Sequence, residues 1–288
     1  MRNQKHRLAK EKLTPVGLIV KILSIVFLTV MALFVILPFA WMILTSLMPN
    51  ARSLLLRPFK LPWPPNFSNY VEAWKMQPFG IYAFNSVFIS TVVTILSVLT
   101  AAMAGYAFAY LKFPFRRTLF LLVLAVLMMP SQVAIIPLYV TMSKLGWLDT
   151  YWALIVPFVA DAYGIYLIKQ NFESIPVDFI EAAKIEGAGH VRILFSILIH
   201  LAKPSLVAYA IMSFKWRWND YFWVLMMTSS KEVRTLPVGL VMMKVEDGGN
   251  QWHLIMAATL LVILPIIIIY LLIQKTLGSN QLAGGVKG

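Results

Sequence analysis

The chain has 288 residues, of which 60% are hydrophobic and only 13% carry a charge at neutral pH. A soluble domain is about half apolar and about a quarter charged, so this composition excludes a soluble globular protein and indicates a protein embedded in a lipid bilayer. The 25 Lys and Arg residues outnumber the 12 Asp and Glu residues. In a polar chain this excess would suggest nucleic-acid binding, but in a membrane protein it bears on the orientation in the bilayer. The absence of cysteine excludes disulfides, iron–sulfur clusters and thiolate zinc sites.

Six apolar stretches are each long enough to cross the hydrocarbon core of a bilayer, which takes roughly 20 residues. In chain order they are residues 18–46, 81–111, 118–142, 151–168, 204–228 and 254–274. The third stretch contains Pro130 and Pro137, where we expect kinks. The sequence therefore predicts an all-α polytopic membrane protein with six transmembrane helices. These helices form one transmembrane domain, residues 18–277, between an N-terminal tail (1–17) and a C-terminal tail (278–288).

The positive charges predict that both termini are cytoplasmic. Cytoplasmic connections carry an excess of Lys and Arg, and most of these residues fall in the two tails and in the connections between spans two and three and between spans four and five. A basic N-terminus before an apolar run could also be a cleaved signal peptide. The run exceeds the usual 7–15 residues, however, so we expect a retained signal anchor.

The connection between predicted spans four and five, residues 169–203, is longer than a passive link requires. It predicts two short helices. Pro176 tolerates a first helical turn, Asp178 and Glu181 suit the positive end of the helix dipole, and Gly187-Ala188-Gly189 ends the first helix. A compact cytosolic helix–turn–helix with small alanines suits docking into a groove of a partner. The same pattern also fits an amphipathic helix pair lying on the lipid surface.

This connection also carries a recognisable motif. Its spacing is E-A-A, three residues, Gly, nine residues, Ile, and it is formed by Glu181, Ala182, Ala183, Gly187 and Ile197. The motif resembles the EAA loop of ABC importer permeases, in which Ile-x-Leu-Pro closes the pattern. Here Ile199-His200 stands where Leu-Pro is expected.

The resemblance extends to carbohydrate ABC importers, and in particular to the smaller permease of maltose importers. It rests on the EAA-like loop together with Pro114-Phe115-Arg116, Trp218-Asn219-Asp220 and residues 283–288. It implies a permease subunit in a bacterial or archaeal inner membrane that moves a sugar or oligosaccharide inward by alternating access. The implied partners are a second related permease, two cytosolic ATPase subunits that bind ATP and Mg, and an extracytoplasmic sugar-binding protein.

By the same resemblance, two parts of the chain would contact the ATPase subunits. The residues concerned are Glu181, Ala182, Ala183, Gly187 and Ile197 in the loop, and Gly285 and Lys287 in the tail. The glycine-rich composition of the tail equally fits a disordered chain end.

No catalytic or metal-binding cluster is visible in the sequence. The phosphate-binding pattern G-x4-G-K-[ST] is absent, the four histidines lack metal-ligand spacing, and no Ser-His-Asp grouping stands out. We therefore expect that this chain is not an enzyme, that it binds no cofactor, metal or nucleic acid, and that a separate polypeptide hydrolyses ATP.

Charged residues within predicted spans suggest a substrate pathway, because ionisable groups are costly in a bilayer. Trp216, Arg217, Asn219 and Asp220 combine aromatic faces with planar hydrogen-bonding groups of the kind that hold sugars. Spacings of three and four residues would place Arg217 and Trp216 each on a helix face with Asp220. Alternatively, Arg217 and Asp220 form an internal pair that locks helix packing or the contact between permeases. Asp161 is either a pore-lining acid or a partner for the cations of span five.

Two further functions fit parts of the sequence. An ABC permease for amino acids or peptides would share the EAA-like loop, although Trp218-Asn219-Asp220 and the tail favour a sugar. A stand-alone secondary carrier would need its coupling groups within the spans and would have no docking loop. Co-purification of an ATPase would separate these functions.

Overall fold

The structure is a computed structural model that describes residues 15–50, 62–246 and 251–284. Within these ranges the chain is helical and contains no strand, as the composition predicts. The helices are α1 (Pro15–Ser46), α3 (Ser68–Met76), α4 (Phe79–Tyr110), α5 (Arg116–Met128), α6 (Ser131–Lys144), α7 (Tyr151–Ile155), the 3-10 helix η1 (Val156–Phe158), α8 (Ala162–Glu173), α9 (Asp178–Ile185), α10 (His190–Arg192), the π-helix η2 (Ile193–Leu198), α11 (Ile199–Leu201), α12 (Lys203–Trp218), α13 (Phe222–Met227), α14 (Leu236–Glu246) and α15 (Trp252–Gly284).

Four helical segments of the described chain are long and apolar enough to cross a membrane. They are Gly17–Ser46, Phe79–Tyr110, Tyr151–Glu173 and Trp252–Leu271. Two helix pairs qualify only when each pair is taken as one bent span: Arg116–Met128 with Gln132–Lys144, bent by 106°, and His190–Leu201 with Lys203–Trp218, bent by 83°. The described residues therefore hold four to six spans, and the number six stays a prediction.

The predicted third span is not one continuous helix. It breaks at Pro130, which follows the end of α5 and precedes the start of α6. Met129, the residue before this proline, has extended backbone angles (φ −81°, ψ 125°), because the proline ring disfavours helical angles there. The expected kink at Pro130 is thus confirmed, whereas Pro137 lies inside α6 without ending it.

The predicted fourth and fifth spans are also interrupted, and the interruptions face each other. In the fourth, η1 separates α7 from α8, and in the fifth, α12 ends at Trp218 before α13 begins. Side chains satisfy backbone groups near these breaks: the Thr100 hydroxyl donates to the Val159 carbonyl, and the Trp223 indole N–H donates to the Ala153 carbonyl at 3.0 Å. Such substitutes allow a broken helix to persist inside a bilayer.

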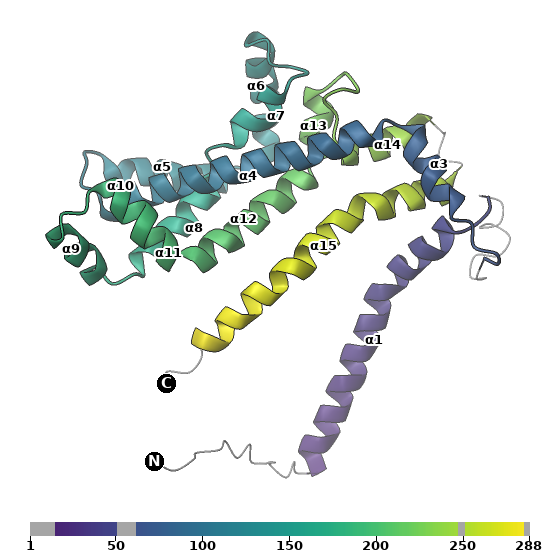
Figure 1. Cartoon of the computed structure of the whole chain (residues 1–288), viewed down its shortest axis with the longest axis horizontal. Helices are drawn as coiled ribbons and strands as arrows, with labels where there is room; N and C mark the ends of the chain where they lie inside the picture. Colours follow the sequence, from purple (N-terminus) through teal and green to yellow (C-terminus); the bar gives the residue numbers. More distant parts are fainter. Residues whose placement is uncertain (1–14, 51–61, 247–250, 285–288) are drawn as a thin grey trace.

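The helices form an elongated arrangement (Figure 1). Helix α4 packs against α8 and α12, and α5 packs against α8. Helices α9 to α11 lie at one end of this layer, while α3 and α14 lie at the other end. Helices α1 and α15 contact each other and run away from the end marked by α3.

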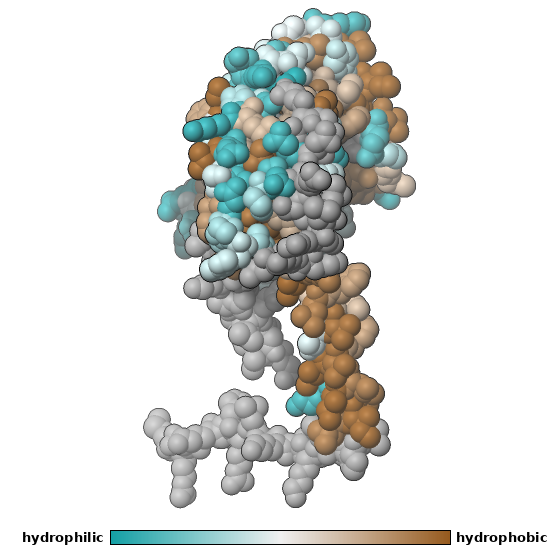
Figure 2. Space-filling view, turned by 90° about the vertical axis from the view of Figure 1, so that its right-hand side faces the viewer, coloured by the Kyte–Doolittle hydropathy of each residue, from teal (hydrophilic) through white to brown (hydrophobic). Residues whose placement is uncertain are grey.

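Close helix contacts hold the layer together. A Cβ atom on Gly105 of α4 would lie 3.1 Å from the Lys169 backbone nitrogen and 3.2 Å from Cγ2 of Ile168 on α8. Small residues of this kind allow helix backbones to approach closely where lipid provides no hydrophobic drive for association. In contrast, α1 is exposed along nearly its whole length, and Figure 2 shows its face as hydrophobic. Helix α1 is therefore a surface for lipid or for another membrane protein.

Candidate functional site

The segment from α9 to α11, which we call the elbow (residues 178–201), has the two helical parts that the sequence predicts. Helix α9 is followed by a turn at Gly187, whose φ of +77° favours glycine. The second part, α10–η2–α11, includes six π-helical residues and then bends by 83° into α12. The elbow is therefore a folded structure rather than a loose connection between two spans.

The outer face of the elbow is apolar in places where soluble proteins usually carry polar groups. Its exposed apolar side chains are those of Phe179, Ile185 (88% exposed), Val191 (72%) and Phe195, with Val177 just before α9. Among the predicted coupling residues, Glu181, Ala182 and Gly187 are exposed. Exposed apolar side chains of this kind are found at interaction sites.

The inner face of the elbow belongs to a buried core of the protein. Ala183 is 6% exposed and belongs to a buried cluster that includes residues of α4, α8 and α12, and the half-buried Ile197 packs against this cluster. Of the two alanines expected to let another surface approach, only Ala182 therefore faces outward. The Tyr106 hydroxyl on α4 lies 2.7 Å from Nδ1 of His190, which adds a polar link to this core. The remaining predicted coupling residues, Gly285 and Lys287, lie outside the described residues.

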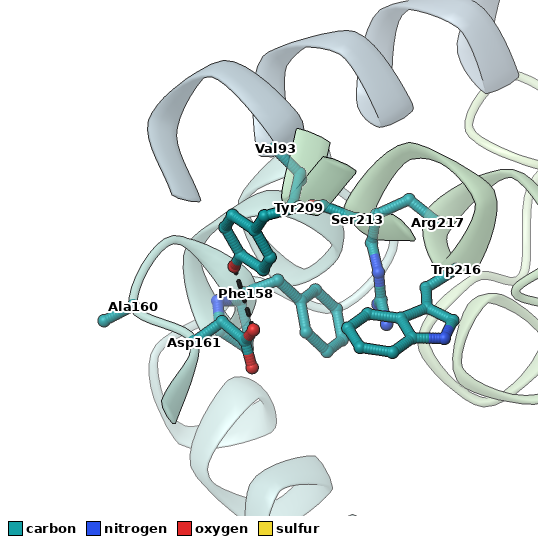
Figure 3. Close-up of a pocket in the computed structure, with 9 residues that line it drawn as sticks. Val93, Phe158, Ala160, Asp161, Tyr209, Ser213, Trp216 and Arg217 are labelled. Carbon is teal, nitrogen blue, oxygen red and sulfur yellow. Dashed lines mark hydrogen bonds between the residues drawn. The ribbon is translucent and has the colours of Figure 1, made fainter. Parts of the chain in front are cut away.

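A second candidate site is a small pocket between the facing helix breaks, which we call the central pocket (Figure 3). Its cavity has a volume of about 70 Å³, and its lining consists of Val93, Pro157, Phe158, Ala160, Asp161, Tyr209, Ser213, Trp216 and Arg217. Asp161 caps the start of α8: its Oδ2 accepts hydrogen bonds from the Gly164 N–H at 2.9 Å and from the Tyr209 hydroxyl at 2.8 Å. A cavity of this size holds a few water molecules and falls below the roughly 300 Å³ of a small-molecule pocket.

The charges of the predicted fifth span are paired with each other. Nη1 of Arg217 lies 2.7 Å from Oδ2 of Asp220, and Oδ1 of Asp220 accepts from the Trp223 N–H at 3.2 Å, at the start of α13. The guanidinium carbon of Arg217 lies 3.6 Å from the centroid of the Phe158 ring, a cation–π contact. The internal pair of Arg217 and Asp220 that the sequence allows is therefore present, and it bridges the end of α12 to the start of α13.

The structure divides the residues predicted for the substrate pathway. Asp161, Trp216 and Arg217 line the central pocket. Asn219 instead donates to the Lys215 carbonyl at 2.9 Å and closes the end of α12. The expectation that Trp216 and Asp220 share a helix face is wrong, because α12 ends at Trp218. Among the described residues no salt bridge joins Asp161 to a cation, so its geometry is that of a pocket-lining acid.

Sequence reasoning missed three polar or aromatic residues of the pocket: Phe158, Tyr209 and Ser213. Tyr209 and Ser213 precede Arg217 by eight and four residues, a spacing that places all three on one face of a helix. That periodicity could have identified the two residues on α12. Phe158 lies at a helix break, so no helical periodicity in the sequence connects it to the other pocket residues.

A separate polar cluster joins two connecting segments, residues 145–150 and 228–235. Asp149, with φ of +59°, accepts through Oδ1 from the N–H groups of Ser229 and Ser230, both at 2.9 Å. Arg234 donates to the Ser229 carbonyl at 3.0 Å. Partial burial works to raise the pKa of Asp149, but the hydrogen bonds from Ser230 and Ser229 and the charge of Arg234 outweigh it and hold the pKa below its ordinary value. We call this cluster the Asp149 clamp.

Within the described residues, no group of three or more His, Asp or Glu side chains is placed to hold a metal ion. The candidate sites are thus the outer surface of the elbow, which carries exposed apolar side chains, and the small polar central pocket.

Comparisons with known proteins agree on one family. Residues 97–280 match the family described as "Binding-protein-dependent transport system inner membrane component". The chain is 34% identical over 247 residues to the arabinooligosaccharides transport system permease protein AraQ of Halalkalibacterium halodurans, with 85% of this chain and 86% of AraQ covered. It is 32% identical over 254 residues to the sulfoquinovosyl glycerol transport system permease protein SmoH of Agrobacterium fabrum, with 87% and 88% covered.

Two further similarities extend this result. The sn-glycerol-3-phosphate transport system permease protein UgpE of Yersinia enterocolitica is 32% identical over 222 residues, with 75% of this chain and 79% of UgpE covered. A chain in the crystal structure of a bacterial ABC transporter involved in the import of the acidic polysaccharide alginate superposes with a TM-score of 0.83 at 27% identity, covering 91% of this chain and 98% of that one. The chain therefore belongs to the binding-protein-dependent transport system inner membrane component family and is a permease subunit of an ABC importer, without an ATPase site of its own.

Proposed function

We propose that this permease carries a carbohydrate into the cytoplasm by alternating access, driven by separate ATPase subunits that bind ATP and Mg. The proposal is supported most directly by the two faces of the elbow. Its outward face has exposed apolar side chains, and its inward face is packed into the core of the permease. Among the similar proteins, AraQ is named for arabinooligosaccharides, SmoH for sulfoquinovosyl glycerol, and the solved transporter for alginate. These names favour a sugar over an amino acid or peptide.

In the membrane, the chain forms one domain, residues 18–277, with six crossings, of which the third is bent at Pro130 and the fifth, residues 204–228, is interrupted after Trp218. Both termini and the elbow lie on the cytoplasmic side of the inner membrane. Two observations support this orientation. Lys and Arg are concentrated in the tails and in the connections on that side, and α1 begins and α15 ends far from α3 and α14 (Figure 1).

The outer face of the elbow contacts an ATPase subunit. Helices that lie on lipid carry a basic polar face, which is attracted to anionic headgroups. Helix α9 and the residue that follows it instead carry more acids than bases, with Asp178, Glu181 and Glu186 against Lys184. Exposed apolar side chains on a helix with an excess of acids suit a protein groove better than a membrane surface. Glu181, Ala182 and Gly187 provide this contact, together with Gly285 and Lys287 of the tail.

The inner face of the elbow transmits the movement. Ile180, Ala183 and Ile193 share one buried core with α4, α8 and α12, and Ile197 packs against it. A close-packed core moves as a unit, so a displacement of the elbow also displaces α8 and α12, the helices that carry Asp161 and Arg217. Closure of the ATPase dimer on ATP draws the elbow inward and turns the pathway outward, and hydrolysis resets the inward-facing state.

The complete transporter contains four further subunits: a second related permease, two cytosolic ATPase subunits, and an extracytoplasmic sugar-binding protein. Exposure of α1 along its length supports a contact with the second permease in addition to lipid. The small volume of the central pocket supports the same partner, because one chain provides room for only part of a sugar.

Charge reversal at Glu181 tests the proposal. In the complex purified with its ATPase and reconstituted with its binding protein, Glu181→Lys and Gly187→Pro should abolish sugar transport and substrate-stimulated ATPase activity while membrane insertion stays intact. Glu181 is exposed, so its replacement leaves the core unchanged, whereas proline cannot adopt the positive φ of residue 187. The matched control is Glu72→Lys on α3, at the opposite end of the molecule, which should leave ATPase co-purification unchanged. Normal stimulated ATPase activity in Glu181→Lys would contradict the coupling role.

A further inference from the structure

The central pocket has one strong hydrogen-bond acceptor that the protein leaves free. Asp161 uses Oδ2 for both of its hydrogen bonds, from the Gly164 N–H and the Tyr209 hydroxyl. Its Oδ1 accepts no hydrogen bond from the residues that the structure describes. Figure 3 shows the carboxylate beside the same hollow as the rings of Phe158 and Trp216. A carboxylate oxygen in this position is ready to accept a hydroxyl hydrogen from a ligand.

The pocket has no free positive charge to match this acid. Among the described residues that line it, Arg217 is the single cation. Its guanidinium is bound to the Asp220 carboxylate at 2.7 Å and covered on one face by the Phe158 ring. Asp161, Arg217 and Asp220 together carry two negative charges and one positive charge. An anionic ligand would therefore be repelled from this half of the pathway.

The aromatic part of the pocket completes a sugar-binding surface. The Trp216 side chain is 43% exposed, so its ring is open to a ligand. Tyr163 packs edge-on against it, with ring centroids 5.6 Å apart, and fixes its orientation. An amphipathic sugar presents C–H groups that pack on an aromatic face and hydroxyl groups that need acceptors. Within the same pocket, Trp216 offers an aromatic face for the C–H groups and Asp161 offers an acceptor for the hydroxyl groups.

From this geometry, and resting on the proposed function, we infer that the central pocket is half of a transient site for uncharged sugars and that it selects against sugar phosphates, sulfonates and uronates. Asp161 Oδ1 accepts one or two sugar hydroxyls, and Trp216 packs on the ring. The cavity of about 70 Å³ takes one edge of the sugar, and the second permease encloses the rest. The similar proteins are named for both neutral and acidic cargoes, and by its charge balance the present chain belongs with the carriers of neutral cargoes.

Binding to the purified permease–ATPase complex tests the inference without the selectivity of the binding protein. Titration calorimetry with arabinotriose and maltotriose should show saturable binding, and glycerol 3-phosphate and a tri-uronate should show none. Asp161→Asn should weaken binding of the neutral sugars about tenfold, since a neutral amide is a weaker acceptor than a carboxylate. Asparagine is as good a helix cap as aspartate, so α8 should persist. Asp149→Asn, the same change outside the pocket, should leave affinity unchanged.

Trp216→Leu provides a second variant that does not touch the cap of α8, and it should also weaken neutral-sugar binding. Equal or tighter binding of the anionic ligands would overturn the inferred selectivity and leave carbohydrate import standing. Unchanged affinity in both Asp161→Asn and Trp216→Leu, or no saturable binding of any ligand, would overturn the site. Vesicle uptake separates these failures from failure of the proposed function: accumulation of amino acids or peptides, with no sugar of either class, would overturn carbohydrate import itself.

Discussion

The elbow and the central pocket use the same three helices in opposite ways. At the elbow, residues of α4, α8 and α12 share a largely apolar core, to which the contact between Tyr106 and His190 adds a polar link. At the pocket, α8 and α12 begin or end at breaks, and the polar groups turn inward: Asp161, Tyr209 and Arg217. A force-transmitting segment needs close packing, whereas a pathway for a polar solute needs helix breaks that present polar groups. The distance between them is spanned by unbroken parts of α8 and α12, which can move as rigid rods.

This contrast predicts different effects of substitutions in the two regions. The elbow surface is built for an external partner, so changes there should affect coupling more than folding. The pocket is built from mutually dependent contacts, so changes there should affect folding as well as transport.

The largest effect is expected from breaking the ion pair beside the pocket. Arg217→Met would leave Asp220 partly buried without its cation, at a cost of about 3 kcal/mol in the free energy of unfolding, near the lower end for buried pairs because both side chains keep some exposure (18% and 16%). Unfolding by SDS titration in mixed micelles measures this cost. The double variant Arg217→Met/Asp220→Leu should recover most of the loss, because no unpaired charge remains. A double variant as unstable as the sum of the singles would show that the pair is not a structural lock.

A smaller loss in the free energy of unfolding is expected from Gly164→Ala, which adds one methyl group. A Cβ atom there would lie 2.2 Å from Cζ of Tyr209, a buried ring with little freedom to move, and would also disturb its hydrogen bond to Asp161. Overpacking of this kind costs about 1–3 kcal/mol, measurable by the same titration. Gly189→Ala in the elbow turn is the matched control, since its φ is −75° and nothing lies within 4 Å of the new atom. Equal losses at both glycines would contradict the proposed difference between the two regions.

The smallest effect is expected at the Asp149 clamp, which belongs to neither region. Its pKa is lowered in the folded protein from an ordinary value of 3.8, so the ionised form adds stability that is present in full above that value. This contribution is lost as the pH falls below 3.8 towards the folded pKa. The melting temperature of the wild type should exceed that of Asp149→Asn slightly at pH 7 and approach it near the acid end. If the difference in melting temperature between the two proteins grew on acidification, the ionised form of Asp149 would not be the stabilising one, and the stabilising role of the Asp149 clamp would be contradicted.

The sequence predicted the class of the protein and the position of the elbow. Long uncharged runs leave few alternatives to membrane helices, and the glycine at residue 187 together with the acids of the first turn placed both ends of α9 to within a residue or two. The EAA-like spacing also indicated the family. The apolar runs and the ends of α9 depend on neighbours along the chain, so local physical chemistry was sufficient for them, whereas the family came from the resemblance.

The breaks within the spans and the composition of the pocket were decided by tertiary structure. Hydropathy reads residues 204–228 as one helix, because Trp223, Val224 and their neighbours are apolar in either conformation. Helix α12 ends at Trp218 because groups far away in sequence stabilise the break. The Trp223 indole N–H donates a hydrogen bond to the Ala153 carbonyl, and the Arg217 guanidinium makes a cation–π contact with the Phe158 ring. Likewise, only the fold brings Tyr209 to Asp161, 48 residues apart. Hydrophobicity determined what enters the membrane, whereas hydrogen bonds between distant segments determined where its helices could be interrupted.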